Sequence, residues 1–190
     1  MAGDPMPRYS YPHTIDNGAG ERITYLRRVA LAGGDRLEGE NVTQPGAGPP
    51  MHVHYLQDEV FTVRVGRLGY QRAGEPERFA GPGETVAFRA GEPHRFWNAG
   101  TGELLSTAYV EPADNAEYLL TQLFESARRR GGTRPDPFDA AFLLTRYRHE
   151  FAITAIPQPL QRALFPLLVA IGRLLGRYRR FADAPEPVRR

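Results

Sequence analysis

Three histidines and one glutamate have the types and spacing best suited to chemistry in this sequence: His52, His54, Glu59 and His94. His52 and His54 are two residues apart, so on a β-strand both imidazoles point to the same face. Glu59 follows five residues after His54, and an uninterrupted strand would direct it to the opposite face. We therefore predict a turn or irregularity around residues 55–58 that resets the phase of the strand.

These side chains form the donor set of a mixed nitrogen and oxygen metal site. Three neutral imidazoles and one carboxylate suit Fe(II), Mn(II), Ni(II), Cu(II) or Zn(II), whereas Ca²⁺ prefers oxygen ligands alone. Thiolate sites are excluded because the chain has no Cys. The set therefore predicts one divalent transition metal of unknown identity. Taken alone, the pair His52 and His54 would favour a hydrogen-bonded core, but Glu59 and His94 shift the interpretation to a metal.

Four protein ligands on an octahedral ion leave two positions open, where water, O₂ or a bidentate substrate can bind. Glu59 is also a possible catalytic base, since a ligand carboxylate lies within reach of any molecule bound beside it. No residue is predicted to bind an organic cofactor.

The residues around this set predict short strands and tight turns. The chain has 20 Gly and 17 Pro, and turn residues bound each apolar or alternating run, which is typical of an antiparallel sandwich or barrel. We predict a barrel over residues 21–113, preceded by an arm at residues 1–20 that has no firm structure or a single edge strand. The expected strands are Ile23–Arg28, Asp58–Val65, Arg67–Arg72, Glu84–Arg89, His94–Asn98 and Leu104–Val110.

From residue 114 to residue 190 the pattern changes to helical spacing and predicts an α-helical C-terminal extension. The expected helices are Asn115–Arg130, Phe138–Phe151 and Leu160–Tyr178, the last with a bend at Pro166. Residues 163–172 carry no charge but are too few to span a membrane. We expect this apolar side to pack on the barrel or on a second subunit; the alternative is a membrane interface where flanking arginines meet anionic lipid.

The two stretches that contain the candidate ligands resemble the two motifs of the cupin family. The first motif is Gly-x5-His-x-His-x3–4-Glu-x6-Gly, matched at every position by Gly46, His52, His54, Glu59 and Gly66. The second is Gly-x5-Pro-x-Gly-x2-His-x3-Asn, matched by Gly83, Gly91, His94 and Asn98. Arg89 stands where the family usually has Pro. We expect this departure to be tolerated, with Arg89→Pro neutral or stabilising, because Gly91 and Pro93 hold the turn.

The resemblance implies a mainly β fold, a small antiparallel jelly-roll barrel with the metal inside, and it assigns His52, His54, Glu59 and His94 as the metal ligands. A single motif pair implies one barrel, and such proteins are often homodimers. The family includes dioxygenases, isomerases, decarboxylases, epimerases, storage proteins and sensory domains, so the fold does not fix the activity. The first hypothesis is a metal-dependent dioxygenase similar to quercetinase-type cupins.

Three alternatives to a dioxygenase stay open, and with them the question whether the chain is an enzyme. One is a non-catalytic module that binds or senses a small molecule through the metal. Another is a cupin isomerase or lyase. The third is an interaction role dominated by the helical extension.

Charge is unevenly distributed along the chain. Residues 1–116 carry 11 Arg against 15 Asp and Glu, whereas residues 117–190 carry 13 Arg against 7. The C-terminal arginines are spread over three expected helices without a recognised module, so we expect no nucleic-acid partner. The first ten residues do not resemble a secretory signal, and a cytoplasmic location is the expectation. The expected partner is a small-molecule ligand or substrate, with no transmembrane segment.

Several other side chains have more ordinary interpretations. His13 and His149 have no partner nearby in the sequence and are expected at the surface. Tyr55 and Gln57 either reach the mouth of a pocket or lie in a solvated turn. Phe61 and Phe96 are expected to pack in the core.

Overall fold

The computed structural model describes residues 8–188. Part of the predicted arm, residues 1–7, lies outside these residues. The described chain forms two antiparallel sheets followed by helices. This confirms the predicted mainly β fold with a helical C-terminal part. Within residues 8–188, no helix is both long and apolar enough to cross a membrane.

The first sheet has six strands in the order β1-β2-β3-β10-β5-β8, and the second has five in the order β11-β4-β9-β6-β7. All the strand pairs are antiparallel. The strands are β1 (His13–Asp16), β2 (Glu21–Leu31), β3 (Gly34–Thr43), β4 (His52–His54), β5 (Asp58–Val65), β6 (Leu68–Arg72), β7 (Arg78–Ala80), β8 (Thr85–Phe88), β9 (His94–Asn98), β10 (Leu104–Glu111) and β11 (Phe151–Ile153).

The alternation of side chains along β5 and β9 fills the space between the two sheets. Phe61 and Val63 of β5, with Phe96 of β9, are at most 4% exposed and belong to one apolar cluster. Because alternate residues of a strand point to opposite faces, the same alternation directs Glu59 and His94 into the interior. The apolar core therefore continues directly into the polar site.

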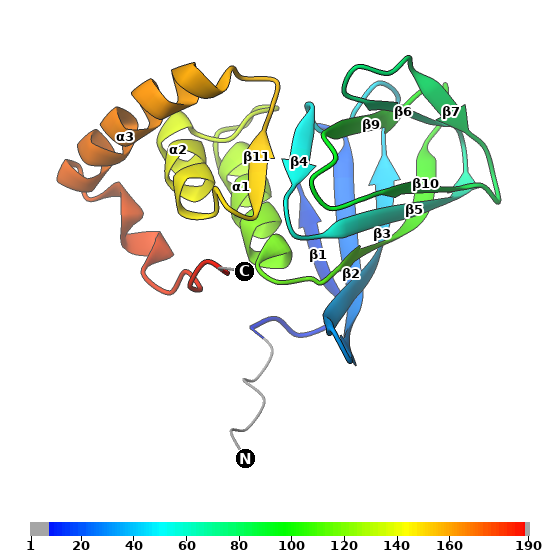
Figure 1. The fold of residues 1–190 in the computed structure, drawn as a ribbon, viewed down its shortest axis with the longest axis horizontal. Helices are drawn as coiled ribbons and strands as arrows, with labels where there is room; N and C mark the ends of the chain where they lie inside the picture. The colour runs from blue at the N-terminus through cyan, green and yellow to red at the C-terminus, as the bar shows by residue number, and fades with distance from the viewer. Residues whose placement is uncertain (1–7, 189–190) are drawn as a thin grey trace.

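The helices are α1 (Ala116–Arg129), α2 (Pro137–Arg146) and α3 (Gln158–Leu174), followed by the short 3₁₀-helix η1 (Arg177–Phe181). Figure 1 shows them gathered on one side of the sheets, with β11 and β4 between. Their own core includes Leu119 and Leu143, with Tyr147 and Phe181 packed against them. Since β11 comes from the C-terminal part but pairs with β4, the division into a barrel at 21–113 and an extension at 114–190 stays a proposal.

Two expected helices have other boundaries in the structure, and strand β3 was not expected. The second helix, expected over Phe138–Phe151, ends at Arg146, because Phe151–Ile153 pairs with the edge of β4 instead. The third runs over residues 158–174 and continues through Pro166; Gly176, with φ of 65°, ends it before Tyr178. β3 was not predicted, because its many charged residues hide the alternation. Cross-strand ion pairs such as Arg27–Glu38, at 2.7 Å, stabilise it.

Candidate metal centre

The four predicted ligands come from three strands that belong to both sheets. His52 and His54 lie on β4, and His52 pairs in register with His94 of the neighbouring β9. Glu59 lies on β5 in the other sheet. The predicted irregularity is confirmed: residues 55–57 are a turn in which the chain passes from one sheet to the other. The turn thereby places the carboxylate opposite the imidazoles.

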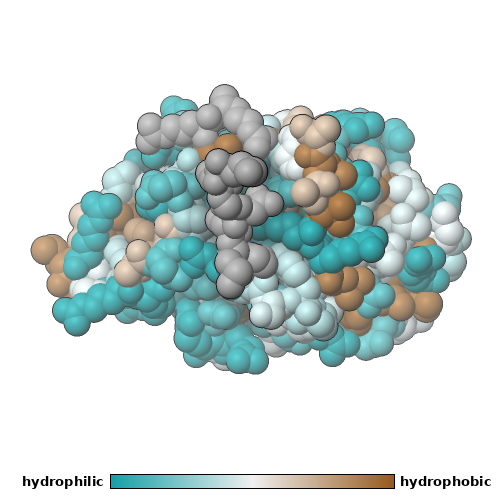
Figure 2. All heavy atoms as spheres, turned by 90° about the horizontal axis from the view of Figure 1, so that it is seen from below, coloured by the Kyte–Doolittle hydropathy of each residue, from teal (hydrophilic) through white to brown (hydrophobic). Residues whose placement is uncertain are grey.

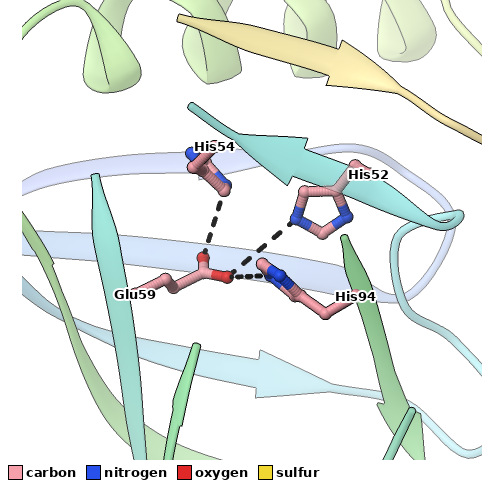
Figure 3. Close-up of side chains that lie close together, drawn as sticks. All are labelled: His52, His54, Glu59 and His94. Carbon is pink, nitrogen blue, oxygen red and sulfur yellow. Dashed lines mark hydrogen bonds and ion pairs between the residues drawn. The ribbon is translucent and has the colours of Figure 1, made fainter. Parts of the chain in front are cut away.

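The structure brings all four side chains together in the interior. One possible donor atom from each lies within 4.8 Å of the others, and all four residues are buried. Figure 3 shows the side chains pointing toward one another. The Glu59 carboxylate is central: its Oε2 lies 2.9 Å from His94 Nε2 and 3.9 Å from His52 Nε2, and its Oε1 lies 4.0 Å from His54 Nε2.

Backbone carbonyl groups fix the orientation of two imidazoles. Nδ1 of His52 donates to the Pro50 carbonyl at 2.8 Å, and Nδ1 of His94 donates to the Glu92 carbonyl at 2.8 Å. In a neutral ring Nε2 then carries a lone pair. His94 Nε2 lies 2.9 Å from a carboxylate oxygen of Glu59, within hydrogen-bond distance when this nitrogen carries a proton. A bound cation or an additional proton makes this contact favourable, so the donor set fits a metal ion.

The electrostatics give two of these groups the protonation states that a metal requires. Burial, with the charges of His54 and His94, lowers the pKa of His52 to about 3. Burial also lowers the pKa of His54. For Glu59 burial acts to raise the pKa, but the hydrogen bond from His94 and the three imidazoles outweigh it and lower the pKa to about 2. An ionised carboxylate with so low a pKa suits a ligand better than a catalytic base at neutral pH.

A cavity of about 80 Å³ opens beside His52, His54 and Glu59. Phe61 and Phe96, expected as core residues, are buried and also line it. Sequence reasoning missed Phe151, which lines the same cavity; its ring centroid lies 5.4 Å from that of His52 and 5.1 Å from that of His54. Only the pairing of β11 with β4 brings Phe151 there, and no local pattern signals that pairing.

Other predicted residues have varied surroundings. Gln57 is buried, with its side-chain amide donating to Asp114 Oδ2 at 3.2 Å, whereas Tyr55 is 37% exposed. His149 is exposed, as expected. The expectation for His13 was wrong: its ring stacks on Tyr9, and Nδ1 lies 3.0 Å from Oε1 of the buried Glu117 on α1. Long-range packing supplies these partners.

The turn between β8 and β9 sets the position of His94. Gly91, with φ of 80°, adopts a left-handed conformation that glycine tolerates best. Arg89 forms an ion pair with Asp58 at 2.6 Å, and its backbone N–H donates to Glu92 Oε2 at 3.0 Å. Since Pro lacks this N–H, the structure changes our expectation for Arg89→Pro from neutral or stabilising to destabilising.

Comparison with known proteins agrees with this arrangement. Residues 41–107, which include all four candidate ligands, match the family model described as a cupin domain. These residues form a cupin-type domain. The oxidoreductase iacF of Pestalotiopsis fici is 33% identical over 85 residues, which cover 44% of this chain and 42% of that protein. The match therefore spans less than half of the length of that relative.

Two solved structures are also similar to part of this chain. A predicted oxalate decarboxylase from Thermotoga maritima has a TM-score of 0.43 and 20% identity, covering 52% of this chain and 90% of that chain. A sugar phosphate isomerase of the cupin superfamily from Silicibacter pomeroyi has a TM-score of 0.41 and 23% identity, covering 48% of this chain and 59% of that chain.

Proposed function

We propose that His52, His54, Glu59 and His94 bind one divalent transition metal ion, and that the chain uses it as a small-molecule dioxygenase. The observation that carries the proposal is the buried set of three imidazoles and one carboxylate, oriented by backbone carbonyls around one point. A divalent metal held there supplies Lewis-acid polarisation and open coordination positions. In a dioxygenase O₂ is the oxidant, and both of its atoms enter the product.

The surroundings of the site support this reaction type. Phe61, Phe96 and Phe151 line the adjacent cavity and give it a largely apolar wall. Such an apolar wall suits a substrate that is itself largely apolar. The name of the similar protein from Pestalotiopsis fici, an oxidoreductase, agrees with redox chemistry, although the similarity covers 44% of this chain.

A second candidate is isomerase or lyase chemistry, which requires a proton to move on the substrate. The buried carboxyl of Glu21 favours it, because this side chain lines the same cavity as the metal centre. Burial raises the pKa of Glu21 to about 7, opposed by a hydrogen bond from Asn41 and increased by the charge of Glu59. A carboxyl near this pKa can both give and accept a proton at neutral pH.

Metal analysis tests the binding site directly. The purified protein is expected to carry close to one divalent metal per chain. His54→Ala and His94→Ala each remove a ligand, so the affinity for the metal falls by more than the roughly 10- to 100-fold that a lost outer-shell partner costs. His149→Ala, at an exposed histidine, is the matched control and retains the metal. Equal metal content in all four proteins would show that the ligand assignment is wrong.

Oxygen consumption separates the candidate reactions. The metal-loaded protein is incubated with small phenols, enols and diketones in an oxygen electrode cell, and products are analysed after labelling with ¹⁸O₂. Uptake of one O₂ per product with both labelled atoms retained supports the dioxygenase. Product formation without O₂ supports the isomerase or lyase, and metal binding without turnover supports a binding module.

A further inference from the structure

The cavity beside the metal centre has a second wall that the proposed metal chemistry does not use. It is formed by β2 and β3, and in the sheet β3 and β10 lie between β2 and the strand of Glu59. Three polar residues of this wall line the cavity: Glu21, Tyr25 and Asn41. Each is at most 5% exposed. Polar side chains so deeply buried are normally hydrogen-bonded. A polar atom of this wall that lacks a partner therefore indicates where a ligand could bind.

Glu21 and Asn41 are held in place by a short chain of hydrogen bonds. The hydroxyl of Thr43 donates to Asn41 Oδ1 at 2.8 Å, and Asn41 Nδ2 donates to Glu21 Oε1 at 3.3 Å. Thr43 thereby fixes which way the amide of Asn41 faces. The contact from Asn41 to the carboxyl is long for a hydrogen bond, and it is a weak compensation for burying that group.

Tyr25 lies four residues after Glu21 on β2, and both residues are buried with side chains that line the cavity. The Tyr25 hydroxyl is buried and has no hydrogen-bond partner in the described part of the chain. Burial, together with the charges of Glu117 and Glu21, raises its pKa well above the ordinary value, so it stays a donor. An unpaired buried hydroxyl costs free energy and is satisfied when a ligand accepts from it.

The charge and size of the cavity restrict that ligand. No arginine of the described chain lines the cavity, the sequence has no Lys, and two carboxyl groups, Glu21 and Glu59, face it. A phosphate or an additional carboxylate would meet repulsion at this end. The volume of about 80 Å³ is also smaller than the roughly 150 Å³ that accommodates a benzene ring. The cavity therefore favours a small uncharged molecule.

We propose that Glu21, Tyr25 and Asn41 bind the uncharged polar end, a hydroxyl or carbonyl group, of a small two-ended substrate whose other oxygen reaches the metal centre. This inference rests on the proposed metal site and narrows its substrate class to neutral acyclic molecules with two oxygen functions. Tyr25 donates to the distal oxygen, and Glu21 accepts from a distal hydroxyl. The phenyl groups of Phe61 and Phe96 contact the hydrocarbon part.

Three probes of similar size separate the features of this substrate. 4-Hydroxy-2-butanone has two uncharged oxygen functions, 2-butanone has one, and succinate carries a carboxylate at each end, so that one negative charge must face the polar wall. Binding to the metal-loaded protein is measured by calorimetry and ligand-observed NMR. We expect 4-hydroxy-2-butanone to bind more tightly than the other two. Equal or absent binding of all three probes to protein that carries its metal would overturn the inference and leave the metal site intact.

Tyr25→Phe tests the donor. It lowers the affinity for 4-hydroxy-2-butanone by about two- to tenfold, the range for one net hydrogen bond. The affinity for 2-butanone is unchanged. Because the hydroxyl has no partner in the free protein, the variant unfolds at the same or a higher urea concentration. Tyr70→Phe, on β6 outside the cavity lining, is the matched control and changes none of these values. A loss of stability without an effect on the probe would identify Tyr25 as structural.

Glu21→Gln tests the charge selection. At pH 8, where the Glu21 carboxyl is largely ionised, this variant retains the shape of the side chain and removes the negative charge, so succinate gains affinity relative to 4-hydroxy-2-butanone. Unchanged selectivity would contradict the assigned role of Glu21. Metal content is measured on the same samples. Wild-type protein that cannot be loaded with metal would refute the proposed function. Metal-loaded protein that fails the probe tests would refute only the proposed substrate-binding role of Glu21, Tyr25 and Asn41.

Discussion

At the scale of single residues, the candidate metal centre combines groups whose burial is costly unless a cation compensates them. Glu59 is ionised and His52 is neutral near pH 7, because their pKa values lie at about 2 and about 3. The clustering of the four side chains was predictable because the two-residue spacing of His52 and His54 and the positions of Glu59 and His94 follow a local pattern. The position of Glu21 and Tyr25 in the wall of the cavity was not predictable, because it arises from the packing of strands that are distant in the sequence.

The pKa of His52 predicts how the metal-free protein responds to acid. Burial and the neighbouring imidazoles lower this pKa to about 3, so the unfolded chain binds a proton near pH 6.5 and the folded chain does not. Stability therefore falls as the pH decreases from about 6.5, by up to about 1.4 kcal/mol per pH unit for one proton. The contribution of Glu59 is present above about pH 4.5 and is lost toward about pH 2.

Urea unfolding of chelator-treated protein at pH 7, 6 and 5 measures this dependence. The midpoint is expected to decrease toward pH 5 in Glu21→Gln protein, where the opposing stabilisation from protonation of Glu21, whose pKa is about 7 in the folded protein, has been removed. His52→Gln removes the titrating group and flattens the decrease, whereas His149→Gln, at an exposed histidine, leaves it unchanged. A midpoint of the Glu21→Gln protein that does not move between pH 7 and pH 5 would contradict the burial argument.

At the scale of elements, strands with clear alternation were predictable and strands defined by their partners were not. Asp58–Val65 was predicted with the bounds that β5 has, because its β-branched residues alternate around a buried face. β7 and β11 have three residues each, too few for a pattern, and exist because they pair with β6 and β4. Pairing with neighbouring strands thus determines these short strands, which the local sequence does not predict.

The turn between β8 and β9 gives a prediction at this scale. Arg89→Pro removes the N–H that donates to Glu92 at 3.0 Å, and it also removes the ion pair with Asp58. Arg89→Ala removes only the ion pair, which is exposed and contributes little. We therefore expect thermal unfolding temperatures in the order wild type, Arg89→Ala, Arg89→Pro, with the larger step at Pro. A Pro variant as stable as the Ala variant would show that the backbone hydrogen bond is dispensable.

At the scale of the whole molecule, α3 presents an apolar surface that residues 8–188 leave uncovered. Leu160, Leu164, Leu167, Ile171 and Leu174 follow one another at spacings of four and three residues, and their exposed fractions lie between 38% and 89%. Figure 2 shows hydrophobic residues exposed at this end of the molecule. The opposite face of α3 packs on α2 and η1, where Val169 and Gly172 are buried. Apolar surfaces of this kind mark interaction sites.

A second copy of α3 fits this surface better than a lipid interface does. The four-three spacing is that of the buried seam between two packed helices, and the small Ala163 and Ala170 beside the seam permit close approach. Two basic residues available to lipid are already paired: Arg177 with Asp136 at 2.8 Å and Arg180 with Asp139. Arg162 and Arg173 lie on the far side of the helix from the seam, at 100° per residue.

We therefore predict a homodimer held by α3 packed against α3. Leu167→Glu places a charge at the centre of the seam, and buried unpaired charges are strongly unfavourable, so the variant becomes monomeric in sedimentation equilibrium. Leu26→Glu is the matched control, since Leu26 is 44% exposed on β2 and Leu167 is 57% exposed; it leaves the dimer intact. Both variants retain the metal, because neither residue lines the site. A monomeric wild type that co-sediments with anionic liposomes and is released by high salt would show that α3 binds lipid instead.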